Sequence, residues 1–291
     1  MRLACIGIGS NAIRLLIAQW SQEGLCVVRR ERRGTRLFAG LVNGALTQQS
    51  IRSSVEAVAE LAVLARQSGA QEIFVFATSA VRDASNGEVF TQLAEQASGT
   101  HIEIITGEQE AVLSYIGVID IGGGSTEFTI GLEERILGAV SLQMGAVRMN
   151  TQMSICSLED YEATMEICLH LIRRDAQQLL HLPKADAWVG VGGTMTTIGA
   201  MHRSVPLFDP QLCEGMKISR ADVCAWGRRI ARMPMADRRQ IVGLMPHRAD
   251  IIPSGVAILE AAMRAFGIEE MALSAHGNMD GYLKKKFKEM Y

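Results

Sequence analysis

The stretch Val118-Ile119-Asp120-Ile121-Gly122-Gly123-Gly124-Ser125-Thr126-Glu127-Phe128 decides the fold of this chain. An apolar run leads into three consecutive glycines and two hydroxyl residues, and a second apolar run begins at Phe128. Apolar, glycine-rich and apolar segments in this order predict a strand, a tight turn and a second strand. Glycines tolerate the positive φ angles of such a turn, and backbone N–H groups turned outward from it form a nest for an anion, typically a phosphate.

Two carboxylates flank the glycine turn. Asp120 stands at its first edge, where it can hold a metal ion that also contacts a bound phosphate, and Glu127 follows on the second strand. Ser125 and Thr126 add hydroxyl donors. A plain glycine hairpin with a surface acid is the alternative. Because such a turn requires neither acid, the pair favours the phosphate site.

Length and composition exclude several classes of protein. The 291 residues, of which 48% are hydrophobic, suffice for two domains of ordinary size. A net charge of −2 gives no general attraction to nucleic acid or to an anionic membrane. No apolar run approaches the roughly 20 residues of a membrane span, and residues 1–17 predict a strand pair, not a signal peptide. The six cysteines without CxxC spacing predict reduced, mostly buried thiols in the cytoplasm, and the six histidines without an HExxH pair argue against a zinc hydrolase.

The same order of elements is expected twice along the chain. Ile6–Asn11 is similar to Ile119–Ser125, so each half opens with the same turn, which indicates a duplicated domain. Two such domains would face a common cleft, where ligands usually bind. The expected strands are Leu3–Ile8, Ile13–Ala18, Leu25–Arg30, Glu72–Ala77, Ile102–Ile105, Gly117–Ile121, Phe128–Ile130, Ile136–Ser141, Ala187–Val191 and Met271–Leu273. The expected helices are one capped by Thr47 and stopped at Gly69, then Gly87–Ala97, one from Glu108, Leu158–Leu180, Thr194–His202, Ser219–Arg232, Ser254–Phe266 and Met279–Met290.

A strongly basic stretch runs from Arg29 to Arg36. It is either a solvated strand end or a rim that attracts an anionic substrate. A group of methionines has the opposite character, because we expect it to fill gaps in the core. These are Met144, Met149, Met153, Met165, Met195 and Met201.

Seven motifs in order resemble one family over nearly the whole chain. They are Gly9–Asn11 with Arg14–Leu15, Ala77–Ala84, Thr106–Ala111, Asp120–Glu127, Ser141–Arg148, Val189–Thr194 and Arg248–Gly255. The family is that of exopolyphosphatases and guanosine pentaphosphate phosphatases (Ppx/GppA), a branch of the actin, Hsp70 and sugar-kinase superfamily. The resemblance implies an α/β fold of two duplicated ribonuclease H-like (actin-like ATPase) domains with a cleft between them. We expect them to span 1–116 and 117–291, and leave open whether the last helix, about 277–291, packs back on the first domain.

The resemblance also implies an activity and a site. The family releases terminal orthophosphate from inorganic polyphosphate or guanosine pentaphosphate, usually with Mg²⁺, and Mn²⁺ is the alternative ion. Dimers are common in the family, so we expect a homodimer. Glu110 would be the general base, Glu127 and Arg82 would assist catalysis, and Asp120 and Glu127 would hold the metal. The phosphates would be bound by Ser10, Asn11, Arg14, Gly122, Gly123, Gly124, Ser125, Thr126, Gly145, Gly193 and Thr194.

The residues taken alone allow plainer roles. Glu110 could be an acid favoured by a helix dipole, Arg82 could pair with Asp83, and Thr194 could be the N-cap of a helix after a strand. These roles remain open beside the implied ones. A sugar or acetate kinase is a further class for such domains, but the Arg82 and Glu110 motifs favour the phosphatase branch.

Three departures from the family pattern bear on activity. Gly7 stands where the family's first loop has an aspartate, residues 111–119 make an unusually short connection, and Met279 replaces an arginine. Loss of the carboxylate at position 7 leaves Asp120 as the main candidate for metal binding. The alternative function is therefore a weakened or inactive binder that senses guanosine tetra- or pentaphosphate or polyphosphate.

Overall fold

The computed structural model describes residues 2–21, 24–107, 117–132, 135–205, 210–276 and 282. The chain forms two compact units, Met1–Leu113 with Asn278–Tyr291, and Ser114–Gly277. The domain boundary expected after residue 116 adjoins residues outside the described part of the chain. The helix expected from Glu108 lies outside it, and so does the helix expected over Met279–Met290 apart from Tyr282. These three expectations stay predictions.

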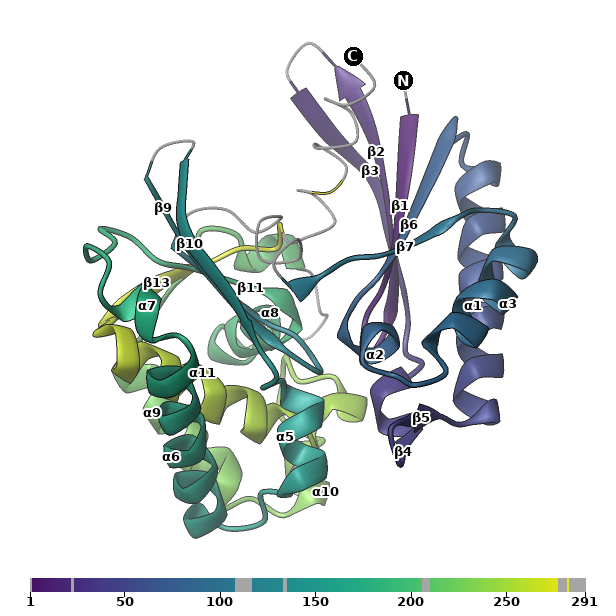
Figure 1. Ribbon diagram of the computed structural model, residues 1–291. Coiled ribbons are helices and arrows are strands. Elements are labelled where there is room, and N and C mark those ends of the chain that lie inside the picture. Colours follow the sequence, from purple (N-terminus) through teal and green to yellow (C-terminus); the bar gives the residue numbers. More distant parts are fainter. Residues whose placement is uncertain are drawn as a thin grey trace. The chain divides into compact units, whose positions relative to one another are not determined.

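The first unit is built on a five-stranded sheet with the order β3-β2-β1-β6-β7. Its first three strands are antiparallel, whereas β1, β6 and β7 run parallel. Helices α1 and α3 pack side by side on one face of the sheet (Figure 1). The elements are β1 Arg2–Ile8, β2 Ile13–Ser21, β3 Gly24–Arg33, η1 Leu37–Gly40, β4 Leu41–Val42, β5 Ala45–Leu46, α1 Gln48–Gln67, β6 Glu72–Ala77, α2 Ser79–Arg82, α3 Gly87–Ser98 and β7 Ile102–Ile104.

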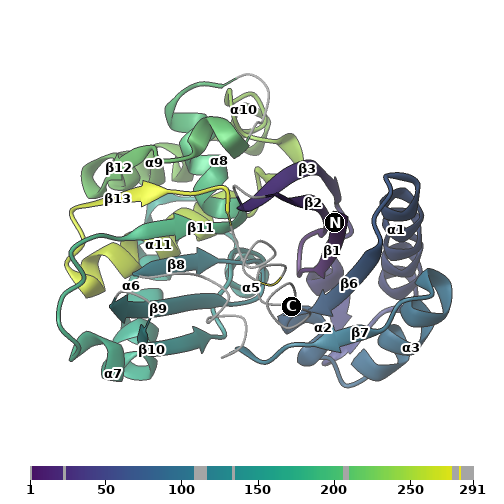
Figure 2. The same ribbon diagram turned by 90° about the horizontal axis from the view of Figure 1, so that it is seen from above.

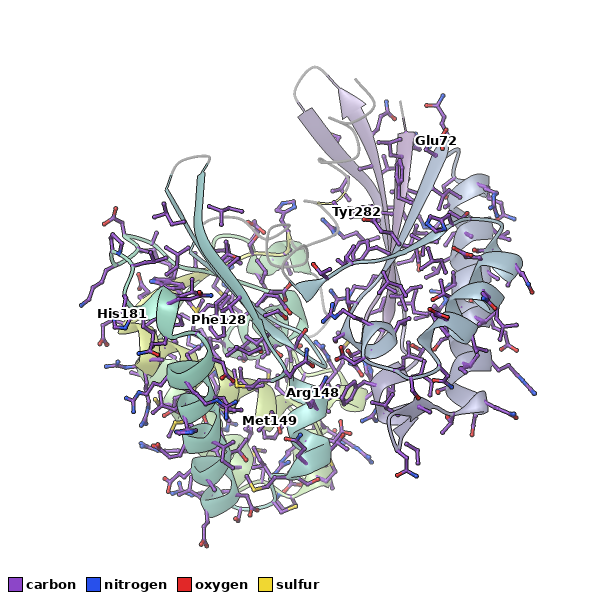
Figure 3. The ribbon with its side chains drawn as sticks, viewed as in Figure 1. Glu72, Phe128, Arg148, Met149, His181 and Tyr282 are labelled. Atoms are coloured by element: carbon purple, nitrogen blue, oxygen red, sulfur yellow. The ribbon has the colours of Figure 1, made fainter. Side chains whose placement is uncertain are left out.

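The other face of this sheet buries Tyr282 from the far end of the chain. Its ring centroid lies 4.8 Å from that of Phe76, and its hydroxyl donates a 2.7 Å hydrogen bond to Glu103 Oε2. Cys5 and Leu16 belong to the same apolar cluster. Figure 3 shows Tyr282 on the side of the sheet turned away from α1. Sequence separation therefore does not prevent a residue near the C-terminus from completing the first core.

The second unit has a six-stranded sheet with the order β10-β9-β8-β11-β13-β12 (Figure 2). Its first five strands repeat the order and the directions of the first sheet. This repeat is what a duplicated fold predicts. The elements are β8 Val118–Ile121, β9 Thr126–Leu132, β10 Arg135–Leu142, α5 Ala146–Gln152, α6 Leu158–Asp175, α7 Gln177–Leu180, β11 Val189–Val191, α8 Gly192–His202, η2 Pro210–Cys213, β12 Lys217–Ser219, α9 Arg220–Ala231, α10 Met235–Arg238, η3 Pro246–Arg248, α11 Ile252–Phe266 and β13 Glu270–Leu273.

Helix α11 is the centre of the second core. Its residues from Ile252 to Met263 are all buried, as an apolar helix without a polar face requires. It packs against α6 and α9. Tyr161 of α6 donates a 2.7 Å hydrogen bond to the buried carboxylate of Glu260 on α11, which also accepts from Arg264. Figure 3 shows Phe128 of β9 inside this unit, where its ring lies 5.3 Å from that of Phe266.

Several expectations about local structure were wrong. The helix expected over Leu158–Leu180 breaks at Ala176, where the chain turns so that Leu179 packs against Gly138 of β10. Helix α8 begins at Gly192, so Thr194 lies inside its first turn and is not its N-cap. Strand β3 ends at Arg33 and not at the expected Arg30, so residues 29–33 of the basic stretch form the end of this strand.

The cysteines and methionines were both expected to be mostly buried, and the methionines follow this expectation better than the cysteines. Cys5, Cys168 and Cys213 are buried, but Cys26 and Cys156 are exposed and Cys224 is half-buried, so the expected burial holds for only half of the thiols. Burial raises the pKa of the Cys168 thiol to about 12. Five of the six named methionines are buried, which confirms their role in the core, and the sixth, Met153, is half-buried.

Candidate active site

The glycine turn of the second unit is held against the start of helix α5. The Gly122 N–H donates to Ser125 O at 3.0 Å and closes the turn. Gly122 O accepts from Ala146 N at 3.0 Å, and Gly123 O accepts from Val147 N and Arg148 N at 2.9 and 3.0 Å. The first turn of α5 thus fixes the conformation of the loop.

These contacts decide where the loop's N–H groups point. In a trans peptide the C=O and the following N–H point in opposite directions. The carbonyls of Gly122, Gly123 and Gly124 point towards α5 and the Arg148 side chain, whose Nε donates to Gly124 O at 2.7 Å. The N–H groups of residues 123–125 therefore point away from α5. Three successive N–H groups turned to one side form a nest for an anion.

Close packing explains the glycine at position 145. A Cβ there would overlap with Gly123 O and Gly124 N, so only glycine lets α5 approach the turn this closely.

Thr126 stabilises the same loop through a side-chain hydrogen bond. Its side chain is fully buried, and its hydroxyl donates a short hydrogen bond to Met144 O. The hydroxyl hydrogen is thus engaged within the protein, and the Thr126 side chain supports the loop.

The two carboxylates of the motif lie side by side. Asp120 on β8 and Glu127 on β9 are directly opposed in the antiparallel register, so both side chains project to the same face of the sheet. Both are buried, with 7% and 2% of their surface exposed. Ser141 of β10 stands opposite Glu127 and donates a 2.6 Å hydrogen bond to Glu127 Oε1. This bond fixes the orientation of the Glu127 carboxylate.

The N-terminus of helix α8 meets Asp120. Val191 pairs with Asp120 in the parallel register of β11 and β8, and Gly192 follows with φ +92°. A Cβ at Gly192 would overlap with Asp120 Oδ1, so the helix backbone lies directly against the carboxylate. The N-terminus of an 11-residue helix carries partial positive charge, which favours an anion there.

An arginine holds this end of α8 in place. The Arg248 guanidinium donates to Gly193 O, and its Nη1 also donates to Thr197 Oγ1 at 2.7 Å. A Cβ at Gly193 would overlap with that guanidinium. Thr194 packs against Gly255 at the start of α11. Gly193 and Thr194 therefore take part in packing that positions the helix start beside Asp120.

In the first unit, the predicted phosphate residues lie at the turn between β1 and β2. Gly9 N donates to Ala12 O at 3.1 Å, and the Ser10 hydroxyl lies 3.1 Å from that of Ser79. The Asn11 side chain is 7% exposed, and neither of its amide atoms has a hydrogen-bond partner among the described residues. Arg14 follows on β2, directly opposite Gly7.

Arg82 ends helix α2, which begins at the Ser79 that contacts Ser10. Its Nη1 donates to Ile105 O at 2.9 Å, and its Nε lies 3.5 Å from Asp83 Oδ1. The ion pair that the sequence left open is therefore present. Arg82 is largely buried and lies in the same part of the first unit as the Ser10 turn.

The predicted residues thus fall into two sets, one in each unit. The second unit brings together Asp120, Glu127, the 122–125 turn, Gly145 and the start of α8. The first brings together the Ser10 turn and α2. Glu110, the predicted general base, lies outside the described residues.

Several residues that shape these sets stand in the quoted motifs but were given no role from the sequence. They are Ser79, Ser141, Arg148, Gly192 and Arg248, each of which contacts a predicted site residue. The partner of Glu127 could have been found, because the expected hairpin between β9 and β10 places Ser141 opposite Glu127. The contact of Arg248 with Gly193 joins distant segments and has no local signal. Figure 3 labels Arg148 at the start of α5.

The carboxylate pair of Asp120 and Glu127 is the candidate site for a metal ion. Among the described residues, no group of three or more His, Cys, Asp or Glu side chains comes together as a metal site. Mg²⁺ is commonly held by one or two carboxylates together with substrate phosphates and water. Asp120 and Glu127 beside an anion-binding turn fit that pattern.

Within the part of the chain that the structure describes, no helix combines the length and apolarity needed to cross a bilayer.

Two sheets that share the order and directions of five strands, one of them with a glycine turn beside paired carboxylates, define an actin-like α/β protein. The chain belongs to the Ppx/GppA phosphatase family, which it matches over residues 16–289. It is 31% identical to exopolyphosphatase 2 of Mycobacterium tuberculosis, over 96% of this chain and 97% of that one.

Two further comparisons agree. The chain is 29% identical to the guanosine-5'-triphosphate,3'-diphosphate pyrophosphatase of Pseudoalteromonas translucida, covering 99% of this chain but 60% of that one. The crystal structure of the Aquifex aeolicus member of the Ppx/GppA family has 26% identity and a TM-score of 0.83, covering 100% of this chain and 99% of that one. The predicted family, the α/β actin-like fold and the enzyme class, a hydrolase of acid anhydrides, are therefore confirmed.

Proposed function

We propose that this chain is a magnesium-dependent phosphohydrolase that releases terminal orthophosphate from inorganic polyphosphate, guanosine pentaphosphate or both. The relatives named exopolyphosphatase and guanosine-5'-triphosphate,3'-diphosphate pyrophosphatase support this substrate class. The observation that carries the proposal is the 122–125 turn, in which the N–H groups of residues 123–125 are directed away from α5 and beside which Asp120 and Glu127 lie. Phosphoryl transfer requires mainly positioning and stabilisation of charge, which such groups supply.

Different residues of the site would bind the phosphates and the metal ion. The N–H groups of residues 123–125 and the Ser125 hydroxyl would donate hydrogen bonds to the terminal phosphate oxygens, and Arg82 would neutralise further phosphate charge. Asp120 and Glu127 would hold Mg²⁺, with Mn²⁺ as the alternative ion. When bound, the metal supplies positive charge that offsets the charge of the phosphates. In this scheme Gly145 and Gly193 contribute the close packing described above, and Thr194 keeps the start of α8 in place.

Glu110 is proposed as the general base on the strength of its sequence motif. It would take a proton from water, whose oxygen forms a new bond to the terminal phosphorus. The bridging P–O bond then breaks, and its electron pair leaves with the shortened chain. A positioned base typically contributes about 10²–10⁴-fold to the rate. Glu127, oriented by Ser141, would hold the water or the metal in place.

A phosphate-release assay tests the proposal. The full chain is titrated with Mg²⁺ in the presence of polyphosphate or guanosine pentaphosphate, and orthophosphate is measured. We expect Glu110→Gln to lower kcat by about 100-fold or more and Asp120→Asn to raise the magnesium requirement. Glu159→Gln, which changes an exposed acid on α6 by the same charge, is the matched control. Failure to release orthophosphate from either substrate at any magnesium concentration would contradict the proposal.

Gly7 favours a second candidate, a weakened or inactive binder of guanosine tetra- or pentaphosphate or polyphosphate. Its position on β1 carries no carboxylate and lies opposite Arg14. Calorimetry that measures affinity without turnover would support this candidate, and Gly7→Asp would then be expected to restore release. Measurable turnover by the natural chain would remove it. Sedimentation of the full chain tests the homodimer that the family resemblance implies.

A further inference from the structure

The peptide groups of the glycine turn in the second unit are fixed in two different ways. Gly122 O and Gly123 O accept hydrogen bonds from backbone N–H groups of α5, at 2.9–3.0 Å. These bonds also fix the N–H groups of the next residues, because a C=O and the following N–H belong to one planar peptide. Gly124 O instead accepts from a side chain, that of Arg148, whose Nε donates at 2.7 Å. The direction of the Ser125 N–H therefore depends on the Arg148 side chain.

The Arg148 guanidinium is held at a second point. Its Nη2 donates to Oε1 of Gln143, which stands in the connection between β10 and α5. The guanidinium is a rigid plane, so donors on one edge that bind two acceptors fix its orientation. The next residue, Met149, is buried in the core and anchors this turn of α5 (Figure 3). Arg148 thus joins the glycine turn to two neighbouring segments of the second unit.

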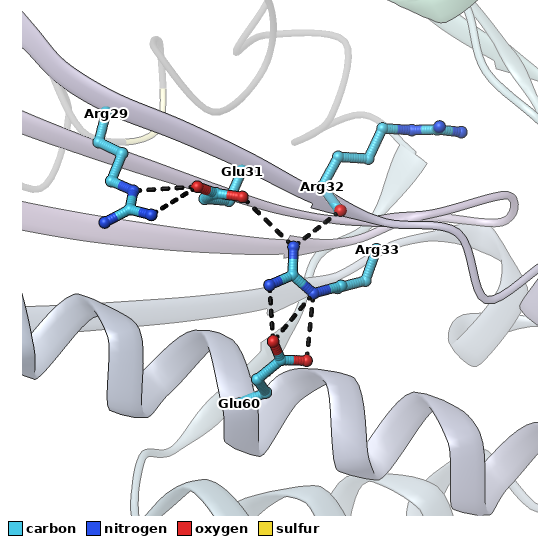
Figure 4. Close-up of polar contacts among 5 residues, drawn as sticks. All are labelled: Arg29, Glu31, Arg32, Arg33 and Glu60. Carbon is cyan, nitrogen blue, oxygen red and sulfur yellow. Dashed lines mark hydrogen bonds and ion pairs between the residues drawn. The ribbon is translucent and has the colours of Figure 1, made fainter. Parts of the chain in front are cut away.

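Arginines on the surface of the first unit bind a different kind of acceptor. Arg33 on β3 donates to both carboxylate oxygens of Glu60, with a shortest distance of 2.6 Å, and also pairs with Glu31 (Figure 4). Ion pairs at the surface contribute little to stability. Two bonds of Arg148 run instead to neutral oxygens, one of a peptide and one of a side-chain amide. Because a charged donor makes a stronger hydrogen bond, it holds the Gly124 carbonyl firmly in one direction.

Gly124 requires such a contact because of its own flexibility. A glycine has no Cβ and adopts a wide range of backbone angles, so the peptide between Gly124 and Ser125 can turn over at low cost. Gly124 is buried, and a buried carbonyl that loses its donor is destabilised until it finds another. If this peptide turned over, its oxygen would replace the Ser125 N–H in the nest. A carbonyl oxygen repels a phosphate oxygen, whereas an N–H binds it.

We propose that Arg148 is a positioning residue for phosphoryl transfer, which holds the peptide between Gly124 and Ser125 so that the Ser125 N–H faces the terminal phosphate. This inference rests on the proposed function, because it concerns a phosphate bound at this turn. Arg148 acts through the peptide and does not itself touch the substrate. A preorganised donor stabilises the transition state most, and loss of one such donor typically lowers kcat by about 10²–10³-fold.

Steady-state release of orthophosphate from polyphosphate gives the first test. Arg148→Met keeps a side chain of similar length but removes the donors. We expect its kcat to fall by about 100-fold, while KM stays within about threefold, as for an interaction made mainly in the transition state. Arg148→Lys retains a charged donor without the planar fork and should restore part of the loss. Arg173→Met changes an exposed arginine on α6 in the same way and should leave both constants unchanged.

Binding of orthovanadate distinguishes positioning from a general loss of structure. Vanadate adopts the five-coordinate geometry of phosphorus during transfer, so it binds as an analogue of the transition state. Calorimetry on the full chain with Mg²⁺ should show binding by the natural chain, and about tenfold weaker binding or less affinity still for Arg148→Met. A merely structural role would lower the number of binding sites per chain and leave Kd unchanged. Gln143→Ala removes only the second contact and should weaken vanadate binding by a smaller factor.

The outcomes separate this proposal from the proposed function. An equal vanadate Kd for the natural chain and Arg148→Met, or no vanadate binding by the natural chain, overturns the positioning role. If orthophosphate release persists in that case, the phosphohydrolase proposal stands. Vanadate binding that depends on Arg148, without any release of orthophosphate, supports the positioning role and contradicts the hydrolase. Urea unfolding checks that each variant is folded; should Arg148→Met fail to fold, an unchanged Kd in both Arg148→Lys and Gln143→Ala overturns the proposal.

Discussion

Replacing Gly192 with alanine probes the contact between helix α8 and Asp120. The substitution has two separable consequences. Gly192 has φ +92°, a conformation that costs a residue with a Cβ roughly 1–2 kcal/mol. The new methyl group would also overlap with Asp120 Oδ1. The shifts needed to avoid such overpacking typically lower stability by a further ~1–3 kcal/mol. We expect Gly192→Ala to lower the free energy of unfolding by about 2–5 kcal/mol in total.

Gly215→Ala is the matched control in the same unit. Gly215 also has positive φ, at +68°, but a Cβ there meets nothing within 4 Å. This variant should therefore lose only the backbone contribution of roughly 1–2 kcal/mol. Urea unfolding measures both, and an unchanged m-value shows that the two-state transition is preserved. The difference between the two variants isolates the clash with Asp120.

The same pair of variants connects stability to function. Because the clash must displace the Asp120 carboxylate or the start of α8, Gly192→Ala should raise the magnesium concentration needed for half-maximal phosphate release. Gly215→Ala should leave it unchanged. The reasoning is refuted if both variants lose equal stability and share one magnesium dependence.

Three other changes test separate contacts. Tyr282→Phe keeps the ring but removes the hydrogen bond to Glu103, so it should cost about 1 kcal/mol in urea unfolding, and no change would mean that the bond contributes nothing. Ser141→Ala removes the hydroxyl that orients Glu127 and should lower activity roughly tenfold, since losing such support commonly costs 10–100-fold; full activity would count against that role. The hydroxyl of Ser219, the N-cap of α9, donates a hydrogen bond to Asp222 and lowers the pKa of that carboxyl. The stabilisation from the ionised Asp222 is therefore present above the unfolded pKa of about 4 and is lost as pH falls through the lower folded value. Asp222→Asn should therefore reduce stability near neutral pH and flatten its fall in acid, as urea midpoints at several pH values will measure; an unchanged acid profile contradicts this.

The sequence by itself determined the strong strands, the longer helices and the glycine turn. Alternation of apolar residues and the glycines that interrupt them act through local geometry, so β1, β8 and the turn after Ile121 were visible without tertiary contacts. The duplication was visible for the same reason. The short elements α5 and β12 were missed, because segments of this length carry too few periodic positions to be recognised.

Only the tertiary structure decided which distant residues meet. Tyr282 reaches the first sheet, Gly192 lies against Asp120, and Arg248 holds Gly193, although no local pattern links these pairs. The pairing of Arg32 with Arg14 depends on the register of two strands, because a shift by one residue would send Arg32 to the other face. Local geometry depends on neighbouring residues, whereas contacts between distant residues form only when the whole chain packs. The sequence therefore predicted the motifs of the candidate site but not the distant residues that hold those motifs in place.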